Sequence, residues 1–249
     1  MSDLTSTLER FALADVSLLE KRSLLRRVDS KFLLPVDEVA PVLERVVDDY
    51  GIVLAGDNRL ATYRTVYYDT PELLCFHDHR RGCRPRQKVR IRHYDDRGVS
   101  FLEIKTKRSE YISSKTRTKQ TFDDSHLSDV GRAFVAEHSR LPSEALEPAV
   151  HTNFQRVTLV GFNTDERLTL DLNLSVSLEA EEIDLGSYAT LEVKQPRFSA
   201  RTPIMRALRA YGYRPASASK YCTATALLKP GLRLNRLLPV LRKIERLRT

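Results

Sequence analysis

Cationic side chains recur at every second position between residues 86 and 107. The first run places four of them on one strand face: Arg86, Lys88, Arg90 and Arg92. A second run places a carboxylate and two lysines on one face: Glu103, Lys105 and Lys107. These assignments follow because successive side chains of a strand point to opposite faces. Guanidinium groups bind phosphate through paired hydrogen bonds, so the pattern indicates a site for an anion with many oxygens.

The segment that positions these side chains reads as a β-hairpin. Asp95 to Gly98 form a short turn between the two runs. The opposite face is apolar in both runs: Val89, Ile91, Leu102 and Ile104. A solvated outer face is the ordinary interpretation of a basic strand. Like charges on neighbouring strand positions repel each other, however, and a bound anion would remove that repulsion.

Other predicted strands repeat the alternation of polar and apolar faces. We expect strands over 26–34, 60–69, 111–122, 151–162, 167–174 and 188–195. Their polar positions hold further charges: Lys31, Arg64, Lys115, Arg117, Lys119, Arg156, Asp171, Glu192 and Lys194. Helical spacing of apolar residues, including Leu19 and Leu25, predicts helices over 4–25, 37–49, 71–79, 127–139, 202–211, from Lys220, and 230–249.

If these helices cover the apolar strand faces, the polar faces point inward. The predicted fold is therefore α+β, an antiparallel β-barrel tunnel with a polar, basic interior and helices packed outside. Glu103, Asp171 and Glu192 would be its lining carboxylates. We divide the chain into an N-terminal helical segment (1–25), the tunnel domain (26–228) and a basic amphipathic C-terminal helix (229–249). That last helix is expected either to dock on the body or to contact an anionic membrane surface or a membrane-protein partner.

Composition narrows the class of protein. The 249 residues have a net charge of +8, which favours polyanionic partners. Nucleic acid is an unlikely partner because the aromatic interleaving typical of single-strand binders is thin. Cys75, Cys83 and Cys222 have no metal-ligand spacing, and no apolar run approaches membrane-spanning length. We therefore expect a cytoplasmic protein, either free or peripheral to the inner face of the membrane. No Gly-rich phosphate loop is present, which excludes a P-loop enzyme.

A series of short motifs resembles a known family when the motifs are taken in order. They are Lys31-Phe32, Tyr68-Asp69-Thr70, Lys88 to Arg92, Leu102 to Lys105, Arg156, Leu191 to Lys194 and Ser219-Lys220-Tyr221. The series resembles the VTC domain, the polyphosphate polymerase domain within the triphosphate tunnel metalloenzymes. The resemblance covers about residues 20–228. It implies transfer of the ATP γ-phosphate to a growing polyphosphate chain, with Mn²⁺ or Mg²⁺ as cofactor.

The resemblance also implies roles for individual residues. The catalytic cations would be Lys31, Arg90, Arg92, Lys105, Arg156 and Lys220. Further substrate-binding cations would be Lys88, Arg64, Arg117, Lys119 and Lys194. Glu192 would hold the metal, and Glu103 would assist it or pair with Lys105.

The first strand departs from the pattern of the related CYTH phosphatases. Those enzymes have Glu-x-Glu-x-Lys, whereas this chain has Arg27-Val28-Asp29-Ser30-Lys31. The departure favours the VTC branch over a CYTH triphosphatase. Two alternatives stay open: a tunnel triphosphatase that hydrolyses inorganic or nucleoside triphosphate, and a non-catalytic polyphosphate or nucleotide sensor.

Overall fold

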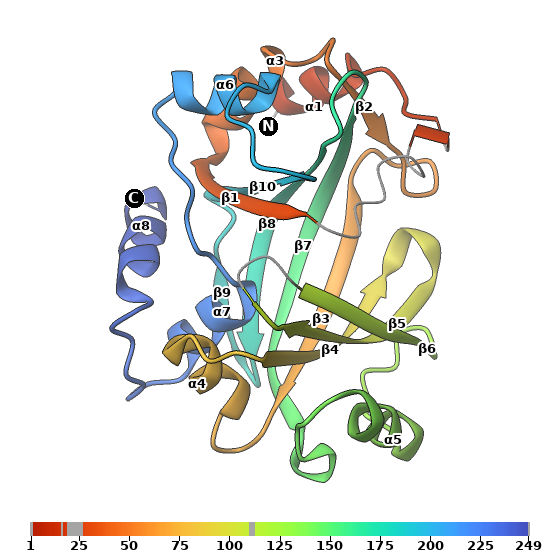
Figure 1. Cartoon of the computed structure of the whole chain (residues 1–249), viewed down its shortest axis with the longest axis vertical. Helices are drawn as coiled ribbons and strands as arrows, with labels where there is room; N and C mark the ends of the chain where they lie inside the picture. Colours follow the sequence, from red (N-terminus) through yellow and green to blue (C-terminus); the bar gives the residue numbers. More distant parts are fainter. Residues whose placement is uncertain (1, 16, 19–26, 110–112, 249) are drawn as a thin grey trace.

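The structure is a computed structural model, and it describes residues 2–15, 17–18, 27–109 and 113–248. Leu19 and Leu25, two positions of the predicted N-terminal helices, and residues 111–112 of a predicted strand lie outside these ranges. Within the described residues, antiparallel strands form one sheet with helices around it (Figure 1).

The sheet follows the hydrogen-bonded order β1-β10-β8-β7-β3-β4-β5-β6, with β2 paired to β7 and β9 paired to β8. The strands are β1 (Val28–Pro35), β2 (Tyr50–Val53), β3 (Ala61–Asp69), β4 (Arg86–Tyr94), β5 (Val99–Lys107), β6 (Ser113–Gln120), β7 (Glu147–Gly161), β8 (Arg167–Leu178), β9 (Glu181–Asp184) and β10 (Tyr188–Gln195). The predicted hairpin of residues 86–107 is confirmed as β4 and β5.

The helices lie on two sides of this sheet (Figure 1). One group is α1 (Ser2–Glu9), the short 3₁₀ turn η1 (Val36–Glu38), α3 (Val39–Glu44) and α6 (Pro203–Ala210). The other group is α4 (Leu74–Arg81), α5 (Asp129–His138), α7 (Lys220–Leu228) and α8 (Leu238–Arg248). Each group covers apolar strand positions, as the alternation in the sequence predicts.

Two apolar clusters therefore flank the sheet instead of one central core. The first places Phe32, Leu168 and Leu191 against the helices of the α1, α3 and α6 group. The second places Ile91 and Leu102 against the helices of the other group. Burial of this apolar surface stabilises the fold and leaves the opposite strand faces for polar side chains.

Some predicted boundaries are wrong. The helix expected over 37–49 ends at Glu44, and the chain then turns into β2, which was not predicted. The strand expected over 151–162 begins earlier, at Glu147, so Pro148 lies within β7. Pro148 pairs with Tyr68 where the register between β3 and β7 shifts, and such an irregularity tolerates a residue without an N–H donor.

The sheet is not strictly closed. Among the described residues, β1 and β6 end the hydrogen-bonded path and are not paired with each other. β6 is thus an edge strand, and its exposed Lys115, Arg117 and Lys119 are the kind of charges that protect such an edge. The predicted tunnel architecture is confirmed, but as a curled sheet and not as a closed barrel.

Both terminal segments pack on the body. Leu8 and Phe11 are buried with α3, and Leu237, Val240 and Ile244 are buried in the cluster that α4 and α7 cover. The C-terminal helix is therefore docked, the first of its two expected arrangements. In the part of the chain that the structure describes, no helix is both long and apolar enough to cross a membrane.

Candidate functional site

The strand register brings the predicted cations onto one continuous inward face. Arg90 lies opposite Glu103 and Lys88 opposite Lys105 in the β4–β5 pairing. Arg156 lies opposite Asp171 in the β7–β8 pairing. Directly opposed residues of paired strands point to the same side, so each alternating set continues from one strand to the next. We call the space that this face lines the tunnel.

Glu103 is the centre of the first charged group. Arg90 donates to Glu103 Oε2 through Nε at 2.8 Å and Nη2 at 2.6 Å, and Lys115 donates to Oε1 at 2.8 Å. The carboxylate side chain is only 1% exposed. Burial alone would raise the pKa of Glu103, but Arg90, Arg92 and Lys115 hold it well below its usual value. Glu103 is therefore ionised throughout the physiological range.

Asp171 is the centre of the second group. Arg156 donates to both of its oxygens, at 2.5 and 2.8 Å, and Lys220 donates to Oδ2. Lys220 reaches Asp171 from the first residue of α7, whose preceding residue Ser219 accepts a hydrogen bond from Lys88 at 2.5 Å. Burial would raise the pKa of Asp171, and its two cations lower it instead.

Glu192 is the centre of the third group. Lys31 of β1 donates to Oε1, and Lys194 lies 3.0 Å from Oε2. Thr169 of β8 donates to Oε2 at 3.5 Å. The pKa of Glu192 is well below its usual value, because Lys194 and Lys31 outweigh the effect of burial. Each lining carboxylate is thus held by two cations.

Lys105 differs from these cations because no described carboxylate lies within ion-pair distance of it. Burial, and next the charge of Lys31, lowers the pKa of Lys105 to about 7. Lys31 belongs to β1, one end of the open sheet, and Lys105 to β5, the strand before the other end, so these two strands face each other across the tunnel. Burial and the charges of Arg86 and Arg84 similarly lower the pKa of Lys107.

Arg92 lies deep in the tunnel beside aromatic rings. It is 5% exposed and donates from Nε to Thr65 at 3.0 Å. Its guanidinium carbon lies 5.4 Å from the ring centroids of both Tyr63 and Phe154, and these two rings stack on each other. The pKa of Arg92 is lowered by burial and then by Arg90. Without a described carboxylate in contact, Arg92 is available to bind an anion.

Three predicted binding residues are placed differently from the rest. Arg64 points to the opposite face of β3 from Tyr63 and Thr65. It forms ion pairs with Asp95 and Asp123 outside the tunnel. Its prediction as a tunnel residue is therefore wrong. Arg117 and Lys119 lie on the inward face but are exposed, since β6 is an edge strand.

The sequence interpretation gave three lining residues no role in the site. The sequence predicts Asp171 as a lining carboxylate, and it predicts Lys115 on a polar strand face, but it assigns neither residue a function. Arg167 begins β8, and burial and the charge of Arg156 lower its pKa. Its position two residues before Thr169 and four before Asp171 was a usable signal, because strand alternation puts all three on one face.

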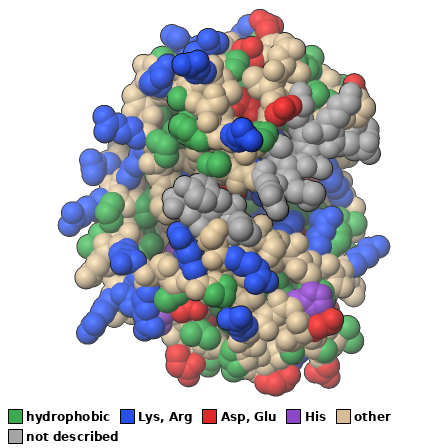
Figure 2. Space-filling model, viewed as in Figure 1, with side chains coloured by type: hydrophobic (Ala, Val, Ile, Leu, Met, Phe, Trp, Pro, Cys, Tyr) green, Lys and Arg blue, Asp and Glu red, His purple; other side chains and the backbone are tan. Residues whose placement is uncertain are grey.

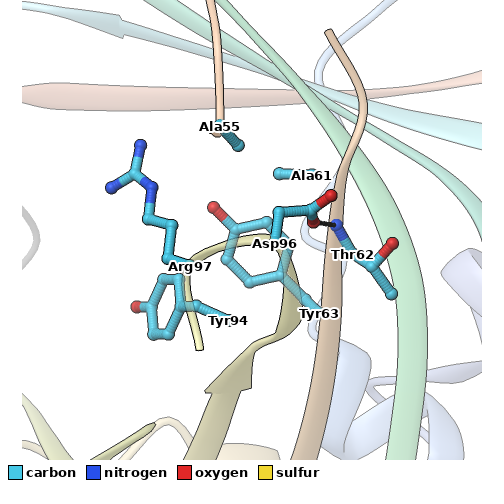
Figure 3. Close-up of a pocket in the computed structure, with 7 residues that line it drawn as sticks. All are labelled: Ala55, Ala61, Thr62, Tyr63, Tyr94, Asp96 and Arg97. Carbon is cyan, nitrogen blue, oxygen red and sulfur yellow. Dashed lines mark hydrogen bonds between the residues drawn. The ribbon is translucent and has the colours of Figure 1, made fainter. Parts of the chain in front are cut away.

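A small cavity lies where Tyr63 and Tyr94 face each other at one end of the tunnel (Figure 3). Their ring centroids are 5.0 Å apart, and Asp96 accepts a hydrogen bond from the Thr62 N–H beside them. The cavity has a volume of only about 10 Å³, enough for roughly one water molecule. Ligand pockets for organic molecules are roughly 300–1,000 Å³, so the charged tunnel is the stronger candidate site.

The carboxylates of the tunnel determine whether it could hold a divalent metal ion. Among the described residues, no three His, Cys, Asp or Glu side chains gather as a metal cluster. Mg²⁺ is commonly held by one or two carboxylates together with phosphate oxygens and water. Glu192 is the most exposed of the three lining carboxylates, at 15%, but Lys31 and Lys194 already pair with its oxygens. It would fit this arrangement once phosphate oxygens take over those two lysines. A divalent ion at Glu192 would take its other ligands from phosphate and water.

Comparison with known proteins agrees with this architecture. A family model described as the VTC domain matches residues 26–229. The chain therefore belongs to the VTC-domain family. No curated protein matches its sequence.

One solved structure shares the fold at low sequence identity, and two others are similar to a lesser extent. A putative adenylate cyclase from Bacillus halodurans has a TM-score of 0.51 at 13% identity, over 78% of this chain and 93% of its own. One from Vibrio parahaemolyticus has a TM-score of 0.47 at 13% identity, over 78% and 94%. A putative adenylyl cyclase from Hippeastrum, described with a dominant triphosphatase activity, has a TM-score of 0.48 at 15% identity, over 82% and 98%.

Proposed function

We propose that this protein is a metal-dependent polyphosphate polymerase that transfers the γ-phosphate of ATP to the end of a polyphosphate chain. The observation that supports it most directly is the inward face itself, where cations from β1, β4, β5, β7, β10 and α7 meet around a single space. Membership of the VTC-domain family supports the same class of substrate.

The proposed reaction is an in-line phosphoryl transfer. A terminal oxygen of the polyphosphate chain attacks the γ-phosphorus, the bond to the β–γ bridging oxygen breaks, and ADP leaves. Little covalent chemistry is required of the protein in such a transfer, so positioning and charge stabilisation do most of the catalysis. A Mn²⁺ or Mg²⁺ ion held by Glu192 would offset charge on the transferred phosphate.

The lining residues have distinct parts in this proposal. Arg92 and Lys105 have no described carboxylate in contact, so we assign them to the phosphates first. Arg90, Arg156, Lys31 and Lys220 are already paired with Glu103, Asp171 or Glu192. We propose that phosphate oxygens replace these carboxylates as partners when the anion binds, so the carboxylates keep the empty tunnel electrostatically balanced.

The test is incubation of the purified protein with ATP and Mn²⁺, followed by gel analysis of polyphosphate and measurement of released phosphate. We expect chains that lengthen with time, and ADP in equal amount to the phosphate incorporated. Release of phosphate without chain growth would select a tunnel triphosphatase instead. Tight binding of tripolyphosphate without any turnover would select a sensor.

Lys105→Met is the variant that localises the reaction to the tunnel. We expect it to reduce synthesis strongly while the protein stays folded. The matched control is Lys229→Met, which removes the same charge outside the tunnel, just after the end of α7. Equal activity of Lys105→Met and the unmodified protein would contradict synthesis in the tunnel.

A further inference from the structure

Positive charge outside the tunnel is concentrated at the C-terminal end of the chain. Residues 229–248 contain seven Lys and Arg side chains and one carboxylate, Glu245, so they contribute +6 of the net charge of +8. The rest of the chain, including all the tunnel cations, is close to neutral. We call the exposed cations of residues 229–248 the C-terminal basic surface.

The packing of α8 determines which way this surface points. Leu237, Val240 and Ile244 are buried in the apolar cluster that α4 and α7 also cover. Arg242 and Arg246, one helical turn apart, are exposed on the opposite side of α8. Figure 2 shows Lys and Arg side chains along the edge of the molecule where Figure 1 places α8. Because the apolar stripe is used inside the fold, the outward face of α8 is basic.

The preceding loop extends this surface toward α4. Arg236 donates from Nη1 to the backbone oxygen of Arg81 at 2.5 Å, which ties the loop to the end of α4. Arg81 and Arg84 are exposed beside this contact. The basic surface is therefore held to the body at a defined place.

A second basic helix, α6, lacks this imbalance. Its Arg206 and Arg209 are exposed, but α6 packs in the same helical layer as η1 and α3, which contribute Asp37, Glu38 and Glu44. Tyr213, just after α6, donates a hydrogen bond to Glu38. Opposite charges thus alternate in this layer, whereas Glu245 is the single acid of the C-terminal basic surface.

We propose that the C-terminal basic surface binds the surface of a membrane that contains anionic lipid. Clusters of four to eight Lys and Arg on an amphipathic helix are typical of such binding. A protein interface would need an apolar centre, and Leu238 is the large apolar side chain that this surface exposes among the described residues. Binding would be peripheral and salt-dependent, because the buried stripe of α8 is not free to insert. This inference does not depend on the proposed polymerase activity.

The experiment is sedimentation of the full chain with sucrose-loaded vesicles of phosphatidylcholine, with or without phosphatidylglycerol, at low and high salt. We expect binding to the vesicles with phosphatidylglycerol alone, and its loss at high salt. The variant R233Q/R242Q/R246Q should lower the partition coefficient on the order of 100-fold, given the usual contribution of each basic residue.

The matched control is R201Q/R206Q/R209Q, which removes an equal number of exposed charges in α6 and just before it. We expect it to keep most of the binding. Equal loss in both variants, equal binding to neutral vesicles, or no vesicle binding by the unmodified protein would each overturn the proposal. A further outcome would also overturn it. If the unmodified protein does not bind vesicles and the R233Q/R242Q/R246Q variant loses polyphosphate binding, the surface binds a soluble polyanion instead of a membrane.

Polyphosphate synthesis without vesicles is measured on the same preparations. The membrane proposal predicts equal synthesis by the unmodified protein and by R233Q/R242Q/R246Q. Vesicle binding by a protein that makes no polyphosphate would contradict the proposed polymerase and leave the membrane inference supported. The two failures are therefore distinguishable.

Discussion

Positive charge is balanced by carboxylates in one region of the tunnel and is left without a carboxylate partner in another. Around Glu103, Asp171 and Glu192, each carboxylate is bound by two cations. Around Lys105 and Lys107, the described residues contain no carboxylate within ion-pair distance, and both lysines have lowered pKa values. The paired groups span neighbouring strands, while the unpaired lysines follow each other on β5.

The difference in pairing separates cations that are already neutralised in the empty tunnel from lysines that are not. A buried ion pair is costly to break, because the remaining partner is left as an uncompensated charge. A buried lysine without a partner lowers the stability of the fold when it is protonated. A bound anion therefore stabilises such a lysine more than it stabilises one that already has a carboxylate partner. We therefore infer that the paired groups stabilise the empty tunnel until phosphate oxygens replace the carboxylates, and that Lys105 is the residue most strongly adapted to the ligand.

The largest predicted effect is on stability at a paired group. Asp171→Ala leaves Arg156 and Lys220 buried without their carboxylate, so we expect a loss of about 3–5 kcal/mol in the free energy of unfolding. Urea denaturation followed by circular dichroism measures it. A loss below about 1 kcal/mol, the range of exposed pairs, would mean that solvent screens this group.

Lys105→Met is predicted to have the opposite effect on stability. The pKa of Lys105 is about 7 in the folded protein and near its usual value of about 10.4 when unfolded. Its charge therefore destabilises the fold fully below pH 7, and the effect disappears as pH rises toward 10. We expect Lys105→Met to stabilise the protein by about 4–5 kcal/mol at pH 6 and progressively less above pH 7.

Urea denaturation at pH 6 and pH 9 checks that sign. Lys119→Met, at an exposed position, should change the free energy of unfolding by less than about 0.5 kcal/mol at either pH. Destabilisation by Lys105→Met at pH 6 would contradict the unpaired state of this lysine.

Binding of tripolyphosphate is predicted to take up a proton near neutral pH. Above pH 7, Lys105 is mostly neutral in the free protein, and the bound anion raises its pKa, so affinity falls as pH increases through 7 to 9. Calorimetric titration in buffers of different ionisation enthalpy measures the proton uptake. Lys105→Met should remove most of it, and an unchanged uptake would assign the proton to another group.

The smallest predicted effect is that of Arg64→Ala. Arg64 pairs with Asp95 and Asp123 on the outer side, and Asp123 is exposed. Exposed pairs contribute about 0–1 kcal/mol, so both stability and polyphosphate synthesis should change little. A loss of synthesis comparable to that of Lys105→Met would return Arg64 to the site.

Regular alternation explains which parts of the site were predictable. Arg90, Lys105 and Glu192 were found because period-two patterning assigns each of them to a strand face. Arg64 was misplaced because its strand, β3, has polar side chains on both faces, including Thr65 and Tyr67 on the inward one. Periodicity cannot decide between two polar faces, and only the pairing with β4 does so.

The amino-acid sequence by itself determined that the sheet is inside out, since its alternating cations and its helical apolar stripes are local patterns. Only the tertiary structure decided which cation meets which carboxylate, and that Lys105 of β5 faces Lys31 of β1. Those contacts join residues far apart along the chain, and their distances depend on the curl of the whole sheet. The physical reason is that charge and hydrophobicity are properties of each residue, whereas ion pairing depends on how distant strands are placed next to each other in three dimensions.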